Sequence, residues 1–136
     1  MAAGKFATAI NCIDGRTQRP VSEWMRIQFS LDYVDTITHP GPEKALTQGP
    51  PAVIDIMREN VGVSVSAHES QLVAIAAHHQ CAGNPVSDDE HKEQVRAACA
   101  VVAQWGFAAR IIGVWVNEWW QVEVIADSGE SSAQAS

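Results

Sequence analysis

Apolar residues in this chain gather in short runs of strand length, separated by longer stretches with helical spacing. Four runs are apolar or β-branched and predict strands, namely Phe6–Cys12, Tyr33–Thr38, Leu72–Ala77 and Ala109–Val116. The third run is apolar at every position, which is typical of a central parallel strand buried on both faces. A fifth run, Trp119–Ala126, alternates between apolar and polar residues and predicts an added edge strand.

The stretch after Arg16 predicts a helix. The positions at helical spacing are Val21, Trp24, Ile27 and Gln28. Pro20 precedes them and suits the first turn of a helix, because the amide that proline lacks has no partner there. We therefore expect Pro20 in the first turn of this helix.

Two further helices are predicted along the rest of the chain. Ala52–Asn60 has an apolar face, and the acidic stretch Asn84–Glu90 predicts the start of a helix that ends at Gly106. The segment Gly62–His68 fits either a strand or an extension of the preceding helix. His39–Pro51 contains four prolines and two glycines and is expected to be a long loop.

Strands that alternate with helices predict right-handed βαβ units and a parallel sheet. The expected fold is α/β with three layers: a mainly parallel four-stranded sheet, helices on both of its faces and an added edge strand. Residues 1–127 form one predicted domain. Residues 128–136 are small and polar, and we expect this tail to be disordered.

The composition narrows the classes of partner. Of the 136 residues 46% are hydrophobic, which suits one core, and no stretch reaches the roughly 18–20 unbroken apolar residues that cross a bilayer. A net charge of −7 and a pI near 5.0 argue against a nucleic-acid partner, which needs a basic face. A basic amphipathic segment for an anionic membrane is also missing. We expect a soluble protein that acts on a small molecule.

Cysteine usage favours a reducing compartment. Three cysteines are an odd number for a disulfide framework, so we expect free thiols and a cytoplasmic location. The N-terminal residues carry no long apolar segment of the kind found in signal peptides. Cys99 shares helical spacing with Val95 and Val102 and is expected to be a packed core thiol.

The other two cysteines lie at the ends of predicted strands. Cys12 ends the first strand, and His78 and Cys81 follow the third. Ligands of open α/β sheets bind beyond the carboxyl ends of the strands. If these two strands are neighbours, about 4.8 Å apart, the three side chains meet. Two cysteines and one histidine form a donor set for Zn²⁺ that leaves one coordination position open.

Asp14 and Arg16 follow Cys12 directly and extend this candidate site. Asp14 is close enough to become a fourth zinc ligand, which would close the site. Arg16 offers a planar guanidinium that can hold the carboxylate through two hydrogen bonds, leaving Asp14 free to orient a hydroxide on the metal. Backbone amides of the turns Ile13–Gly15 and Ala82–Asn84 are candidates to donate hydrogen bonds to the sulfur atoms.

These residues resemble the signature of the β-class carbonic anhydrases, Cys-x-Asp-x-Arg after one strand and His-x-x-Cys after a later strand. The motifs occur here in that order, as Cys12-Ile13-Asp14-Gly15-Arg16 and His78-His79-Gln80-Cys81. The resemblance covers roughly residues 5 to 116 and indicates a short, divergent branch of the family.

The resemblance implies a zinc lyase that hydrates CO₂ reversibly to bicarbonate through zinc-bound hydroxide. Cys12, His78 and Cys81 would hold the metal, and Asp14 and Arg16 would be catalytic. It also implies a homodimer or a higher homo-oligomer. The aromatic cluster at the predicted edge strand, with Trp115, Trp119 and Trp120, independently favours a buried subunit interface.

Two alternatives keep the same zinc site. In one, the enzyme acts on a CO₂ analogue such as COS or CS₂. In the other, the protein binds zinc without catalysis, and Asp14 closes the site. A thiol redox role is disfavoured because Cys12 and Cys81 do not form a C-x-x-C pair.

The remaining histidines receive no catalytic role. His39 ends the second strand on the edge of the sheet that carries the zinc site, and either shuttles protons or is an exposed turn residue. His79 is expected on the surface or beside the ligands. His68 is expected near the opposite end of a strand, and His91 on a solvated helix face.

Overall fold

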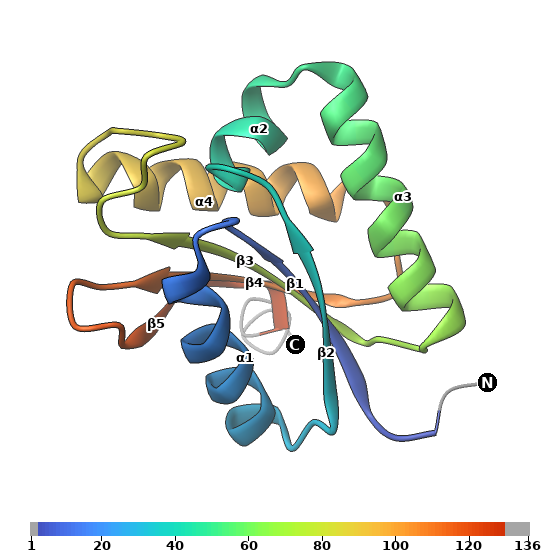
Figure 1. Ribbon diagram of the computed structural model, residues 1–136. Coiled ribbons are helices and arrows are strands. Elements are labelled where there is room, and N and C mark those ends of the chain that lie inside the picture. The colour runs from blue at the N-terminus through green and yellow to red at the C-terminus, as the bar shows by residue number, and fades with distance from the viewer. Residues whose placement is uncertain (1–2, 130–136) are drawn as a thin grey trace.

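A five-stranded sheet covered by helices on both faces forms the centre of the molecule in the computed structural model, which describes residues 3–129 (Figure 1). The strands are β1 (Phe6–Asn11), β2 (Tyr33–Thr38), β3 (Leu72–His78), β4 (Arg110–Val116) and β5 (Val122–Asp127). The helices are α1 (Gly15–Phe29), α2 (Pro42–Gln48), α3 (Pro51–Ala67) and α4 (Asp88–Ala103).

The strands lie in the order β2-β1-β3-β4-β5. The first four are parallel, and β5 pairs antiparallel with β4 at one edge. Helix α1 covers one face, and α2, α3 and α4 cover the other. The predicted three-layer α/β fold, with four parallel strands and an added edge strand, is therefore confirmed. Because β1 and β3 are neighbours, their carboxyl ends lie side by side.

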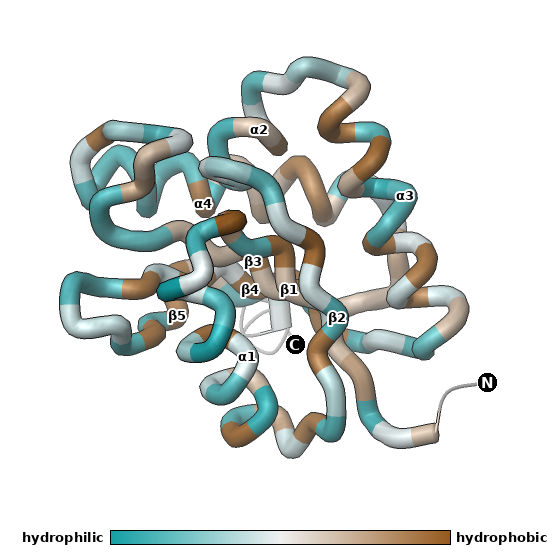
Figure 2. Tube along the Cα trace, viewed as in Figure 1, coloured by the Kyte–Doolittle hydropathy of each residue, from teal (hydrophilic) through white to brown (hydrophobic). Residues whose placement is uncertain are grey.

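Strand β3 divides the core into two layers. All of its residues are buried. Val73, Ile75 and Ala77 pack with the layer that contains α2, α3 and α4, whereas Ala74 and Ala76 pack with the α1 layer. Hydrophobic segments run along the strands, while the surrounding loops are mostly hydrophilic (Figure 2). This alternation explains why a strand buried on both faces is apolar at every position.

Helix α1 begins earlier than the sequence pattern indicated. The side chain of Asp14 caps it by accepting a hydrogen bond from the backbone N–H of Arg16 at 3.0 Å. Pro20 consequently lies inside the helix, and its predicted position in the first turn is wrong. The buried face consists of Thr17, Val21 and Met25, whereas Ile27, predicted on the apolar face, is 76% exposed.

The predicted loop His39–Pro51 contains a short helix, α2. Pro42 occupies its first turn, where a missing N–H costs nothing. The residues that α2 buries are Pro42, Glu43, Ala45 and Leu46. Helix α3 continues to Ala67, so the ambiguous segment Gly62–His68 extends the helix and ends at His68, its C-cap.

The C-terminal end of the described residues returns to the sheet. The Ser128 hydroxyl accepts a hydrogen bond from the backbone N–H of Ile111 at 2.9 Å, and the Gly129 N–H donates to Asp127. The rest of the tail predicted to be disordered, 130–136, lies outside the described residues.

Within residues 3–129 no helix combines the length and apolar character needed to cross a bilayer.

Candidate metal centre

Cys12 follows the last residue of β1 and is held there by its own neighbours. The Asn11 side-chain oxygen accepts hydrogen bonds from the Cys12 backbone N–H at 2.8 Å and from the Thr17 hydroxyl at 3.0 Å. Both partners are buried, so this end of the strand is fixed from within the core. Sequence reasoning missed Asn11 and Thr17, because only their positions beside Cys12 and on the inner face of α1 give them this role.

His78 is the last residue of β3, and its ring orientation is set by one hydrogen bond. Nδ1–H donates to the backbone carbonyl of His79 at 2.9 Å. In the neutral ring the other nitrogen, Nε2, therefore carries a lone pair. It is buried and has no hydrogen-bond partner among residues 3–129. A buried acceptor without a partner costs free energy, and a metal ion is the partner that this tautomer suits.

Cys81 comes back to His78 through a tight turn, with Gln80 in the left-handed conformation (φ 56°). The Sγ atoms of Cys12 and Cys81 lie 3.8 Å apart, and the three donor atoms of Cys12, His78 and Cys81 lie within 4.8 Å of one another. Sulfur ligands of a tetrahedral zinc ion, at Zn–S distances of about 2.3 Å, are about 3.8 Å apart. All three side chains are buried. The donor set thus fits Zn²⁺ in chemistry and in spacing.

The two thiols differ in acidity because they share a hydrogen bond. That bond from Cys81 lowers the pKa of Cys12 and raises the pKa of Cys81. Backbone amides favour the thiolate forms: those of Asp14 and Gly41 lower the pKa of Cys12, and that of Gly83 lowers the pKa of Cys81. The turns after both strands supply donors, as the sequence indicated. Gly41, from the loop after β2, was not foreseen.

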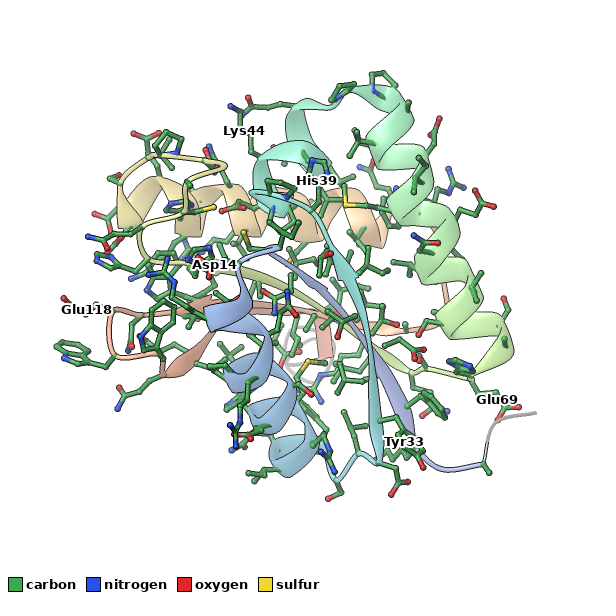
Figure 3. All side chains as sticks on the ribbon, in the orientation of Figure 1. Asp14, Tyr33, His39, Lys44, Glu69 and Glu118 are labelled. Carbon is green, nitrogen blue, oxygen red and sulfur yellow. The ribbon has the colours of Figure 1, made fainter. Side chains whose placement is uncertain are left out.

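Asp14 stands beside the three donor atoms without joining them. Arg16 holds its carboxylate in a two-pronged ion pair, with Nε 3.0 Å from Oδ1 and Nη2 2.7 Å from Oδ2. These hydrogen bonds lower the pKa of Asp14 to about 2. Oδ2 is 3.9 Å from the Nε2 atom of His78. An ionised carboxylate therefore lies at the edge of the donor set (Figure 3).

Arg16 is itself in contact with the turn that precedes the edge strand β5. Its guanidinium lies over the ring of Trp120, which precedes β5. Trp120 adopts a left-handed backbone conformation with φ 62°, which is unfavourable for a bulky side chain. The Asp14–Arg16 pair thus depends on α1 and on the turn before β5.

A family model described as "Putative carbonic anhydrase" matches residues 2–126. The chain belongs to this carbonic anhydrase family. Its membership, with the β-class structures below, confirms the resemblance drawn from the Cys12–Arg16 and His78–Cys81 motifs. A comparison with curated proteins found no match.

Solved β-carbonic anhydrases share the fold of this family member at low sequence identity. The enzyme CafA of Aspergillus fumigatus is 12% identical, with 98% of this chain and 81% of that chain covered and a TM-score of 0.61. Isoform I from Trichomonas vaginalis is 14% identical over 88% of this chain and 82% of that chain, with a TM-score of 0.59. A tetrameric enzyme from Sordaria macrospora is 11% identical over 91% and 81%, with a TM-score of 0.58.

Two other histidines lie away from the candidate metal centre of this carbonic anhydrase relative. His91, predicted on a solvated helix face, is fully buried and bonds to Glu43, so that prediction is wrong. It failed because the partner comes from α2, a helix hidden in a predicted loop. His68 bonds to Asp35 at 2.6 Å near the opposite end of the sheet, as expected.

The remaining candidates divide between surface and core. His39 is partly exposed and directly follows β2 (Figure 3). Its backbone N–H donates a hydrogen bond to the backbone carbonyl of Asn11. The His79 ring bonds to Asp88 at 2.9 Å. Cys99 is buried in the core as predicted, and burial raises its pKa to about 12. Trp115 is also buried, whereas Trp119 is 69% exposed.

Proposed function

We propose that this chain is a zinc-dependent lyase that interconverts CO₂ and bicarbonate. Cys12, His78 and Cys81 would hold the metal, and Asp14 and Arg16 would be the catalytic pair. The observation that carries the proposal is the buried cluster of two sulfur atoms and one imidazole nitrogen that has no partner among the described residues, with an ionised carboxylate at its edge. Family membership supports the same reaction.

The charges of the donor set support a zinc ion. Two thiolates and one neutral imidazole would balance the two positive charges of Zn²⁺. When bound, zinc supplies a Lewis acid that brings the pKa of water close to neutrality. The amides of Asp14, Gly41 and Gly83 stabilise the thiolates, and the carbonyl of His79 keeps the Nε2 lone pair of His78 available.

Asp14 has two tasks in this proposal. As an ionised acceptor it orients a water molecule for attack on CO₂, because it takes a hydrogen bond and cannot donate one. Its second task is to stay off the metal, and Arg16 enforces this by occupying both carboxylate oxygens. An Asp14 that left Arg16 would close the site, as in the non-catalytic alternative.

We also propose that the protein forms a homodimer or a higher homo-oligomer and works in the cytoplasm. A groove of about 530 Å³ between α1 and the start of β5 is lined partly by apolar side chains, among them Trp24, Ile27 and Trp120. The Sordaria macrospora relative is described as tetrameric. Light scattering of the purified protein would test the assembly, and a monomer at micromolar concentration would contradict it.

Metal analysis and stopped-flow CO₂ hydration on the purified protein test the enzymatic proposal. We expect one zinc ion per chain and a hydration rate well above that of buffer. Sulfide release from COS and CS₂, measured in parallel, separates the substrate classes. One zinc per chain with no hydration above buffer would refute the lyase activity and leave the metal site standing.

A further inference from the structure

Glu43 and His91 form a fully buried hydrogen-bonded pair that the proposed reaction does not use. The His91 Nδ1–H donates to Glu43 Oε2 at 2.7 Å, and both side chains have no exposed surface. Each also has a buried atom without a partner among the described residues, Glu43 Oε1 and His91 Nε2. An apolar pair of similar volume would often be at least as stable. The pair therefore calls for a role beyond stability.

The position of the pair indicates that role. Glu43 lies in the first turn of α2, and His91 lies one turn into α4. The loop before α2 contains Gly41, and the loop before α4 contains Gly83. The Glu43–His91 bond therefore ties together the two helix starts that follow these loops.

The two loops touch each other at their glycines. A Cβ atom on Gly41 would lie 2.8 Å from the Cβ of Asn84, and one on Gly83 would lie 2.7 Å from the Cβ of Pro40. Only glycine allows the two backbones to approach so closely. The backbone amide of Gly41 lowers the pKa of Cys12, and that of Gly83 lowers the pKa of Cys81. A shift of either helix start would move both amides relative to the sulfur atoms.

We propose that Glu43 and His91 are positioning residues for the metal centre. Their bond fixes the starts of α2 and α4, and thereby keeps the Gly41 and Gly83 amides on the sulfur atoms of Cys12 and Cys81. This inference rests on the proposed function only in taking these sulfurs as metal ligands. Groups that support metal ligands from outside typically contribute about 10- to 100-fold to metal affinity.

The chain offers a matched control. His68 and Asp35 form a second histidine–carboxylate pair, at the opposite end of the sheet. In both pairs the imidazole packs on an aromatic ring, that of Trp115 for His91 and that of Phe6 for His68. His91→Phe and His68→Phe therefore remove the same chemistry at two places.

The first measurement is amide hydrogen exchange at Gly41 and Gly83 in the zinc-free protein. We expect protection to fall at least about tenfold in His91→Phe and Glu43→Ala. It should stay unchanged in His68→Phe, and in Glu43→Gln, which keeps an oxygen acceptor for His91. A folded His91→Phe with unaltered protection at Gly41 would overturn the inference, as would a tenfold loss in Glu43→Gln.

The second measurement is zinc affinity by competition with a chelator. We expect about 10- to 100-fold weaker binding in His91→Phe and an unchanged affinity in His68→Phe. Equal losses in both variants would mean that the pair supports only general stability. Amide exchange is read without zinc or substrate, so a protein that fails to hydrate CO₂ would refute the proposed function and leave this result readable.

Discussion

The guanidinium carbon of Arg16 lies 4.9 Å from the centroid of the Trp120 ring, while its nitrogens hold both oxygens of Asp14. Trp120 holds this position in a left-handed backbone conformation, which is energetically unfavourable for a residue other than glycine. The Asn117 side-chain oxygen fixes the same turn by accepting from the N–H groups of Trp119 and Gln121, each at 3.0 Å. The Trp120 ring thus helps to hold the Arg16 guanidinium in place, and Arg16 in turn holds the Asp14 carboxylate.

Trp120→Ala should lower the rate of CO₂ hydration by roughly 2- to 5-fold, the effect expected for a guanidinium–ring contact at an exposed site. The Arg16 side chain is 57% exposed, and loss of the ring lets it release Asp14 more often toward the metal. Stopped-flow rates and the absorption spectrum of the cobalt-substituted protein would detect this. Trp119→Ala removes a neighbouring indole that is 69% exposed and should change neither. Similar losses in both variants would contradict the role of Trp120.

Cys12→Ser, His78→Ala and Cys81→Ser should each abolish stoichiometric zinc binding, because each removes one donor atom of the cluster. Metal content after dialysis gives the measurement. Cys99→Ser is the control, since Cys99 is a thiol of α4 that is buried in the core. Full zinc content in any of the first three variants would remove that residue from the ligand set.

Replacing Asp14 should separate its catalytic role from its structural one. Asp14→Asn keeps an oxygen that can cap α1, whereas Asp14→Ala removes the cap and should cost about 1 kcal/mol of stability. Both should keep zinc and lose about 100-fold or more in hydration rate. Urea unfolding and stopped-flow kinetics on the two variants test this. Activity close to wild type in Asp14→Asn would show that the charge is dispensable.

The Asp14–Arg16 pair should make stability depend on pH in acid. Arg16 lowers the pKa of Asp14 from 3.8 to about 2 in the folded protein. The contribution is therefore complete above pH 3.8 and is lost as the pH falls through about 2. The difference in free energy of unfolding between wild type and Arg16→Ala should shrink over that range. A constant difference down to pH 2 would argue against the pair.

Gly113→Ala should destabilise the fold by about 1–3 kcal/mol through overpacking. A Cβ atom at this position on β4 would lie 2.6 Å from Val95 Cγ1 and 2.9 Å from Cys99 Sγ, both on α4. Gly15→Ala is the control, because a Cβ there meets nothing within 4 Å. The midpoints of thermal unfolding of both variants test this prediction. Equal midpoints would mean that α4 shifts to accommodate the added methyl group at little cost in stability.

The sequence located the candidate metal centre because the relevant information was local. Cys12 and Cys81 each follow an apolar run, and parallel neighbouring strands bring such ends together. Asp14 and Arg16 are close in sequence, so their pairing also followed from spacing. These features need only the strand order, which the motif resemblance supplied.

Features that depend on distant partners were not predictable in the same way. His91 stands among charged residues of α4, and its partner Glu43 is 48 positions away in a segment whose prolines and glycines suggested a loop. One signal was present, since Gly41-Pro42-Glu43 has the proline and acidic residue of a helix start. For Pro20, the competing signal was Asp14, whose capping started α1 earlier.

The parallel pairing of β1 with β3 joins Cys12 and Cys81 across 69 positions of sequence. An unfolded chain has no such chelating site, so zinc would bind the native state alone. By mass action, free zinc at a hundred times its dissociation constant would add about 2.7 kcal/mol to the free energy of unfolding. Supply of the ion would then govern how much of the chain persists against proteolysis, whether or not the proposed activity holds.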